Sequence, residues 1–143
     1  MIKKFEISQL DQIMNIWLNT NLEAHDFINE SYWHENFEFV KDIIPKSEVY
    51  VYADDNRIKG FVGIVDNYKI AGIFVLSEYQ NLGIGTKLLD FCKKKYSYLE
   101  IDVYTNNGRA VDFYKRNDFL IKNTNLNVDN SHDEYVMTYR KAL

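Results

Sequence analysis

Apolar residues in the first third of the chain recur at helical spacing. The i, i+3, i+4, i+7 pattern of an amphipathic helix is carried by Leu10, Ile13, Met14, Trp17 and Leu18. Ser8 is the predicted N-cap of this helix, a short strand over residues 3–7 precedes it, and the polar residues 19–21 are expected to weaken it. A second helix is predicted from about residue 31 to residue 44, because Pro45 is typical of the position just after a helix end.

From residue 48 the pattern changes to a period of two. Strands are predicted at residues 49–52, 58–65 and 70–76, separated by turns at 54–56 and 66–67. A glycine-containing turn then leads into a helix with Leu88, Leu89 and Cys92 on its apolar face. The remaining predicted elements are a strand at 99–103, a turn at 106–109, a helix at 110–116 and a hairpin of residues 119–122 and 135–140 around a loop at 127–131. These elements predict an α+β fold with a largely antiparallel sheet.

Composition narrows the class of protein. A chain of 143 residues with 46% hydrophobic residues and one proline is typical of one folded domain, here taken as residues 1–143. It contains no run of about 18 or more apolar residues and no signal-peptide pattern, and its single Cys92 fits a reducing compartment, so we expect a cytoplasmic protein that does not bind a membrane. The net charge of −4 without a basic block argues against a nucleic-acid partner and tolerates a cationic acceptor such as an amine.

The glycine turn, from Gln80 to Thr86, is the first candidate for chemistry. A strand that leads through a glycine turn into a helix gathers free backbone N–H groups at the positive helix end, which suits a phosphate. The dinucleotide fingerprint fails, because Leu88 stands at its third glycine position. The P-loop fails as well, because Thr86 and Lys87 follow Gly85 in the wrong order.

The pattern that does fit, Gln80-x-x-Gly83-x-Gly85 between strand and helix, resembles the pyrophosphate loop of the GNAT superfamily of acyl-CoA-dependent N-acyltransferases. A second stretch, Asn107-x-x-Ala110-x-x-Phe-Tyr114, followed by Phe119, is similar to the downstream motif of that family. It departs from the family at Asp118, where glycine is usual, but aspartate can adopt the left-handed backbone conformation. The order of elements resembles the family over essentially the whole chain, and residues 24–28 and 32–33 resemble a subgroup of small single-domain bacterial members.

This resemblance implies acetyl-CoA as the acyl donor. In the family, a splayed strand pair exposes main-chain groups to the pantetheine arm and the glycine turn binds the pyrophosphate. Lys87 lies in the first turn of the following helix, where a nearby anion would favour its charge, but it is equally well interpreted as a solvated lysine. The donor-binding residues implied are Ile73, Phe74, Val75, Gln80, Leu82, Gly83, Ile84, Gly85, Thr86, Asn107 and Tyr114. For Asn107, a simple helix N-cap is a competing interpretation that could coexist with donor binding.

Tyr114 is the residue that the resemblance assigns to catalysis, as general acid at the thioester sulfur. Tyrosine, with a pKa near ~10, is a weaker acid than a thiol near ~8.5, so a hydrogen bond to the developing thiolate is more economical than full proton transfer. His25 is the preferred candidate for the general base, with Glu78, Glu100 and Asp102 as alternatives.

The acceptor pocket is predicted to be lined by Phe27, Tyr32, Trp33 and Phe61, although ordinary core packing is expected for at least two of them. Cys92 is expected to be a packed, inert thiol, and the spacing of His25, His34 and His132 predicts no metal site.

Two functions follow. The first is an N-acetyltransferase that moves an acetyl group from acetyl-CoA to a primary amine, on a small molecule, a protein lysine or a protein N-terminus, by direct attack in a ternary complex. The second is an inactive acyl-CoA-binding regulatory module, which the retained Tyr114 and Asn107 disfavour. The expected partners are acetyl-CoA and an amine acceptor, with the chain acting as a monomer or homodimer.

Overall fold

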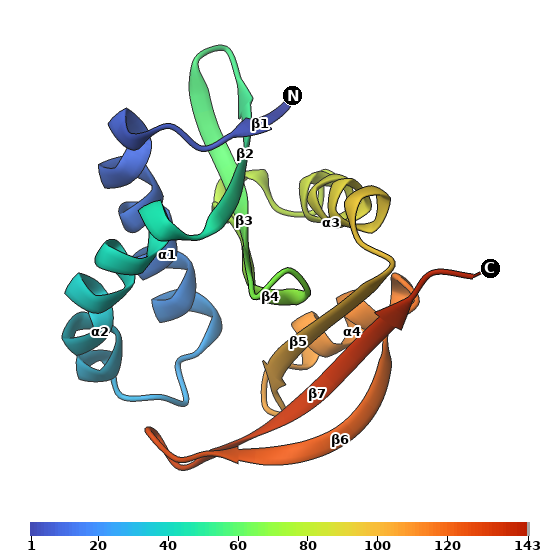
Figure 1. The fold of residues 1–143 in the computed structure, drawn as a ribbon. Helices are drawn as coiled ribbons and strands as arrows, with labels where there is room; N and C mark the ends of the chain where they lie inside the picture. Colours follow the sequence, from blue (N-terminus) through green and yellow to red (C-terminus); the bar gives the residue numbers. More distant parts are fainter. Residues whose placement is uncertain (143) are drawn as a thin grey trace.

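The computed structural model describes residues 1–142, which form four α-helices and a seven-stranded mixed sheet (Figure 1). The helices are α1 (Leu10–Ala24), α2 (Glu30–Ile43), α3 (Ile84–Lys95) and α4 (Gly108–Arg116). The strands are β1 (Ile2–Lys4), β2 (Glu48–Asp54), β3 (Arg57–Val65), β4 (Lys69–Val75), β5 (Tyr98–Tyr104), β6 (Leu120–Asn127) and β7 (His132–Arg140). None of the helices in residues 1–142 is long and apolar enough to cross a membrane.

The sheet has the order β1-β2-β3-β4-β5-β7-β6, and every neighbouring pair is antiparallel except β4 with β5. The hairpin turns after β2 and β3 have two consecutive residues at positive φ, Asp55 with Asn56 and Asp66 with Asn67. Two positive-φ residues in sequence match the twist of antiparallel strands, and Asp and Asn adopt this conformation more readily than most residues. The predicted α+β, largely antiparallel architecture is therefore confirmed.

Two hydrophobic cores lie on opposite faces of the sheet. One packs α1 and α2 against β2 and β3, with Ile13, Met14 and Phe61 fully buried. The other packs α3 and α4 against the opposite face, with Leu88, Leu89 and Leu99 at 0% exposure. In Figure 1 the α1–α2 pair and the α3–α4 pair accordingly flank the strands from two sides. The sheet thus lies between two helical layers. Helices of both layers lie against its middle, where β4 meets β5.

The first helix differs from its prediction at both ends. Residues Ile7–Gln9 form a 3-10 turn, so the first strand ends at Lys4 and Ser8 is not the N-cap of α1. Residues 19–21 do not weaken the helix. The Thr20 hydroxyl donates to the Ile16 carbonyl over 2.7 Å and the Asn21 amide donates to the Trp17 carbonyl over 2.8 Å, so both polar side chains are satisfied inside the helix.

The second helix begins and ends one residue earlier than predicted, and Asn29 caps it by accepting from the Ser31 N–H over 2.9 Å. Pro45 lies inside a further 3-10 turn, Ile44–Lys46, rather than directly after the α-helix. At the C-terminal side, β6 and β7 are longer than the predicted hairpin strands, because pairing continues to Asn127 and His132. The polar residues of β6 are tolerated there because the strand lies at the sheet edge and is exposed over most of its length.

Candidate active site

Strands β4 and β5 separate after only two paired residues. The parallel register contains Lys69 with Glu100 and Ile70 with Ile101, although each strand has seven residues. The separation begins at a β-bulge: Gly63 pairs with Gly72 and Ile64 with Ile70, which leaves Ala71 without a partner on β3. A bulge bends its strand and increases the local twist. The β4 edge from Ala71 to Val75 therefore turns away from β5, and the predicted splayed strand pair is present.

The glycine turn lies directly after this exposed edge. Gly83 has a left-handed backbone with φ of 85° and immediately precedes α3, and a Cβ placed on it would face open space. The first intrahelical bond of α3 is donated by the Lys87 N–H to the Gly83 carbonyl over 3.0 Å, so the N–H groups of residues 83–86 have no earlier carbonyl within the helix to bind. The turn thus presents free amides at a helix N-terminus, which is the geometry that binds phosphate.

Gly85 lets two helices approach each other. A Cβ on Gly85 would lie 3.2 Å from Cζ of Phe113 on α4, tighter than ordinary van der Waals contact. Phe113 in turn packs against the ring of Tyr114, with centroids 5.0 Å apart. The absence of a side chain at Gly85 therefore lets the first turn of α3 dock against the helix that carries Tyr114.

Helix α4 begins at the predicted N-cap, and the turn predicted at Asp118 follows its end. Asn107 is its N-cap, and the Asn107 Oδ1 accepts from the Ala110 N–H over 3.2 Å. Just after the C-terminus, Asp118 has φ of 72°, and the Phe119 N–H donates to the Tyr114 carbonyl over 3.0 Å. Asp118 thus occupies the left-handed position at which glycine is usual, and the turn is kept.

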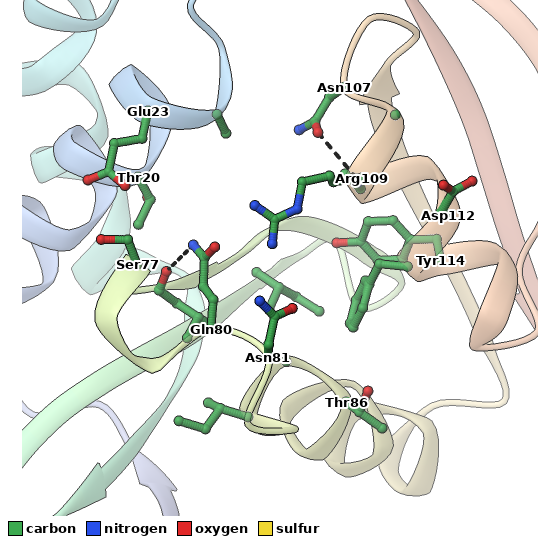
Figure 2. Close-up of a pocket in the computed structure, with 18 of the residues that line it drawn as sticks. Thr20, Glu23, Ser77, Gln80, Asn81, Thr86, Asn107, Arg109, Asp112 and Tyr114 are labelled. Carbon is green, nitrogen blue, oxygen red and sulfur yellow. Dashed lines mark hydrogen bonds between the residues drawn. The ribbon is translucent and has the colours of Figure 1, made fainter.

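These elements surround one cleft of about 1040 Å³. Figure 2 shows Thr20 and Glu23 of α1 on one side, Asn107, Arg109 and Tyr114 on the opposite side, and the loop that precedes α3 along the bottom. Of the predicted donor-binding residues, the cleft is lined by Ile73, Val75, Gln80, Gly83, Ile84, Gly85, Thr86, Asn107 and Tyr114. Phe74 packs on Phe61 at a centroid distance of 4.9 Å, and the Leu82 side chain is exposed, so neither side chain contributes to the cleft wall.

Tyr114 is 5% exposed, and its hydroxyl points into the cleft (Figure 2). Among the described residues the hydroxyl has no hydrogen-bond partner, and burial, followed by the Cys92 side chain, raises the pKa of Tyr114 well above its ordinary value. A neutral hydroxyl with a free proton is a suitable hydrogen-bond donor. It is a poor source of a fully transferred proton, because a higher pKa makes the phenol a weaker acid.

His25 lies at the C-cap of α1 and does not line the cleft. Its Nδ1 lies 3.1 Å from Oδ1 of Asn21 and its Nε2 lies 3.1 Å from Nδ2 of Asn107. Burial lowers the pKa of the imidazole from 6.5 to about 4, so the ring is neutral at pH 7. Both ring nitrogens therefore face hydrogen-bond partners, and the assignment of His25 as general base stays a prediction.

The carboxylates considered as alternative bases are all engaged elsewhere. Glu78 pairs with Arg57 over 3.2 Å, Asp102 pairs with Lys69 over 2.7 Å, and Glu100 accepts from the Tyr98 hydroxyl over 3.0 Å. None of the three lines the cleft. The carboxylates on its wall are instead Glu23, Asp26 and Asp112, which the sequence reasoning did not consider.

Of the four aromatic residues predicted for the acceptor pocket, Phe27 lines the cleft. Trp33 and Phe61 are 6% and 2% exposed in the α1–α2 core, and Tyr32 packs against Trp33 at 4.9 Å. Cys92 is fully buried, and burial raises the pKa of its thiol to about 12, as expected for an inert packing residue.

Arg109 and the polar residues of α1 are the main features of the cleft that were not predicted from the sequence. Arg109 reaches from α4 over the middle of the cleft in Figure 2. Thr20, Glu23 and Ala24 line the opposite wall at the spacing i, i+3, i+4, which is one face of a helix. That spacing is present in the sequence and could have been found if the helix had been extended to residue 24.

Comparison with known proteins gives a consistent result. Residues 45–120 match the family described as acetyltransferase (GNAT) domain. The chain is 30% identical over 122 residues to the peptidyl-lysine N-acetyltransferase YiaC of Escherichia coli, which covers 85% of this chain and 84% of that protein. It is 26% identical over 121 residues to the peptidyl-lysine N-acetyltransferase YjaB of Salmonella typhimurium, with 84% and 83% covered.

Solved structures share the fold. The solution structure of apo YjaB from Escherichia coli superposes with a TM-score of 0.87 at 19% identity, covering 99% of this chain and 98% of that one. The structure of yncA, a putative acetyltransferase from Salmonella typhimurium with its cofactor acetyl-CoA, superposes with a TM-score of 0.71 at 13% identity, covering 100% and 94%.

Proposed function

This chain belongs to the GNAT family of acetyltransferases, and we propose that it transfers the acetyl group of acetyl-CoA directly to the side-chain amine of a protein lysine. The observation that carries the proposal is the meeting of three features in one cleft: the unpaired edge of β4, the free amides before α3 and the unpartnered hydroxyl of Tyr114. The residues suit acetyl-CoA as the donor, because its pyrophosphate and its pantetheine amides require these kinds of groups.

The donor is held mainly by backbone groups in this proposal. The amides of residues 83–86 bind the pyrophosphate, and the β4 edge at Ile73 and Val75 pairs with the pantetheine amides. Gln80 already uses one lone pair of this edge, since its Nε2 donates to the Val75 carbonyl over 2.9 Å. Arg109 adds the positive charge that a pyrophosphate needs and that the neutral Gln80 does not provide.

The chemistry is a direct displacement. The neutral amine attacks the acetyl carbon, a C–N bond forms, the C–S bond breaks, and the electron pair of that bond leaves on sulfur as the thiolate of CoA. The nitrogen is positively charged after attack, and it becomes the neutral amide by losing a second proton, which goes to solvent or to the thiolate. The Tyr114 hydroxyl donates a hydrogen bond to this thiolate as its charge develops. Direct attack is favoured over an acyl-enzyme because no cysteine lines the described cleft and Cys92 is fully buried.

A lysine acceptor fits the charges of the cleft. Its wall carries Glu23 and Asp26 near the C-terminal end of α1, whereas the α4 side carries Arg109 and Arg116 with a single carboxylate, Asp112. The acidic end attracts a protonated amine and provides carboxylates that can accept the proton lost before attack, while the basic end suits the phosphates of the donor. The names of the YiaC and YjaB relatives support the choice of a peptidyl lysine over a small amine.

The Tyr114→Phe variant tests the catalytic assignment. Loss of one hydrogen-bond donor at a developing anion is expected to lower kcat on the order of 10²-fold, with little change in acetyl-CoA affinity because the backbone contacts remain. Turnover is measured as release of free CoA thiol with a lysine peptide, and affinity by calorimetry. A normal kcat in Tyr114→Phe would remove the role.

A matched control is Tyr139→Phe, which deletes a phenolic hydroxyl on β7 beside Phe119, outside the cleft. We expect this variant to turn over like the wild type. The alternative function, an acyl-CoA-binding regulatory module, predicts acetyl-CoA binding without thiol release over a panel of lysine peptides, N-terminal peptides and small amines.

A further inference from the structure

A continuous chain of hydrogen bonds links α1 to α4 across the end of the cleft. The Trp17 carbonyl accepts from Nδ2 of Asn21 over 2.8 Å, and Oδ1 of Asn21 lies 3.1 Å from Nδ1 of His25. On the other side of the ring, Nε2 of His25 lies 3.1 Å from Nδ2 of Asn107, and Oδ1 of Asn107 accepts from the Ala110 N–H over 3.2 Å. The chain joins residues that are 82 positions apart in sequence.

The two ends of this chain determine the direction of every bond in it. A carbonyl can only accept, so Asn21 must present its oxygen to His25. A backbone N–H can only donate, so Asn107 must present its NH₂ group to His25. The ring must therefore carry its proton on Nδ1 and accept at Nε2. The neutral Nδ1–H tautomer is the single state of His25 that satisfies all four bonds.

The surroundings hold the ring in place. It stacks on Trp33 of α2 at a centroid distance of 5.3 Å and 25°, and it meets the edges of Tyr104 and Phe27 at 4.9 and 5.7 Å. These contacts come from α2, β5 and the loop after α1. A ring that is stacked on one face, contacted at its edges and hydrogen-bonded at both nitrogens can transmit its orientation to Asn107.

We propose that His25 is a positioning residue for acetyl transfer, which holds the Asn107 carboxamide in the orientation that caps α4 and presents its remaining N–H and lone pair to the acyl donor. The carboxamide has two N–H groups and two lone pairs, of which His25 and Ala110 each use one. Asn107 lines the cleft, and its bond to the start of α4 is drawn in Figure 2. The expected effect of His25 on acetyl-CoA binding rests on the proposed function. The expected tautomer of His25 rests on the hydrogen bonds alone.

This role differs from that of a base in what it requires of the ring. A base needs a lone pair directed at the reacting amine, whereas here the Nε2 lone pair is directed at Asn107 and the ring does not line the cleft. A protonated ring would set an N–H against the NH₂ group of Asn107. Rotating that carboxamide would only move the conflict to the Ala110 N–H. The geometry thus favours an imidazole that stays neutral throughout the reaction.

The tautomer is measured first, because it depends on neither a variant nor turnover. In protein labelled with ¹⁵N in its histidine rings, long-range proton–nitrogen correlation spectra at pH 7 are expected to report a protonated Nδ1 and an unprotonated Nε2 for His25. A charged ring, or a proton on Nε2, would overturn the inference even if acetyl transfer is confirmed.

A pair of variants then separates positioning from base catalysis. Glutamine at position 25 can place its amide oxygen near the site of Nε2 and accept from Asn107, whereas asparagine is long enough only for the contact with Asn21. Since one hydrogen bond contributes about 1 kcal/mol net, His25→Asn is expected to raise the KM for acetyl-CoA about fivefold, with His25→Gln within about twofold of wild type. If His25 were the base, both variants would lose kcat equally, on the order of 10²-fold or more, because both lack the imidazole.

The Asn107→Ala background is the second control. When His25 acts through Asn107, His25→Asn changes nothing further once Asn107 is alanine, whereas independent roles give multiplicative effects. If no acceptor is turned over, acetyl-CoA affinity is measured by calorimetry in place of KM. Failure of the proposed function then appears as absent turnover, whereas failure of this inference appears as unchanged affinity in the variants. Thermal unfolding of each variant identifies any that do not fold, in which case the spectra of the wild type decide.

Discussion

The partly buried His25 makes the stability of this protein depend on pH in a window that can be specified. In the folded state burial lowers the pKa of the ring to about 4, whereas the unfolded chain has the ordinary value of 6.5. Between these values the unfolded state binds more protons than the folded state, so acid favours unfolding. The contribution of the neutral ring to the free energy of unfolding is fully present above about pH 6.5 and is lost progressively as the pH falls toward 4.

The size of the effect follows from the two pKa values. At pH 5 the proton-binding polynomials of the unfolded and folded states differ by a factor of about 30, which corresponds to about 2 kcal/mol of unfolding free energy. The full difference below pH 4 is about 3 kcal/mol. For a domain with a typical stability of about 5 to 15 kcal/mol, this is a large fraction.

Urea unfolding at pH 7 and pH 5 measures this effect when the wild type is compared with His25→Gln. The variant keeps every other titrating group, so its own pH dependence accounts for the carboxylates and for His34 and His132. The free energy of unfolding of the wild type is expected to fall by about 2 kcal/mol more than that of the variant over this interval. An equal loss in both proteins would mean that His25 titrates normally in the folded state, and the argument from its burial would be refuted.

Two further predictions concern local structure. Asp118→Gly is expected to raise the free energy of unfolding by about 0.5 to 1 kcal/mol, because glycine adopts the left-handed conformation at φ of 72° without the strain of a Cβ. The Asp118 carboxylate is 84% exposed and lies 3.9 Å from the Lys93 amine, so the loss of this long ion pair costs little. Urea unfolding measures the change, and a lower stability would contradict the reasoning. Cys92, fully buried and with its pKa raised to about 12, is expected to react with Ellman's reagent at pH 8 only after unfolding. If the native protein reacted with Ellman's reagent as fast as a free thiol, the core around α3 would have to open in the folded state.

The features that the sequence determined are local in the chain. The hairpin turn at Asp55 and Asn56 and the helix cap at Asn107 each depend on a few adjacent residues. The glycine turn is local too, since Gly83 provides the positive φ and the following helix provides the free amides. Such features can be predicted because the backbone conformations and hydrogen bonds that define them involve neighbours in sequence. The assignment to the GNAT family followed from two of these local stretches and their order.

The prediction that residues 19–21 weaken helix α1 was wrong because it used local propensity alone. Asparagine and threonine compete for backbone hydrogen bonds and so have low helix propensity in isolation. In the folded chain Thr20 and Asn21 are buried against the core, and each donates to a carbonyl one turn earlier. Burial, which the local sequence does not specify, made continuation of the helix more favourable than its end.

Only the tertiary structure decided which of several similar side chains belong to the site. Phe27, Trp33 and Phe61 are all aromatic, but Phe27 lines the cleft while Trp33 and Phe61 fill the core, because hydrophobic spacing marks a buried face without saying what covers it. The distant pair His25 and Asn107 is the clearest case. Each residue was singled out in the sequence, one as a base and the other as a donor contact or cap. Their hydrogen bond exists only because the fold brings the end of α1 to the start of α4, and a contact between residues so far apart in the chain is set by the packing of the whole domain.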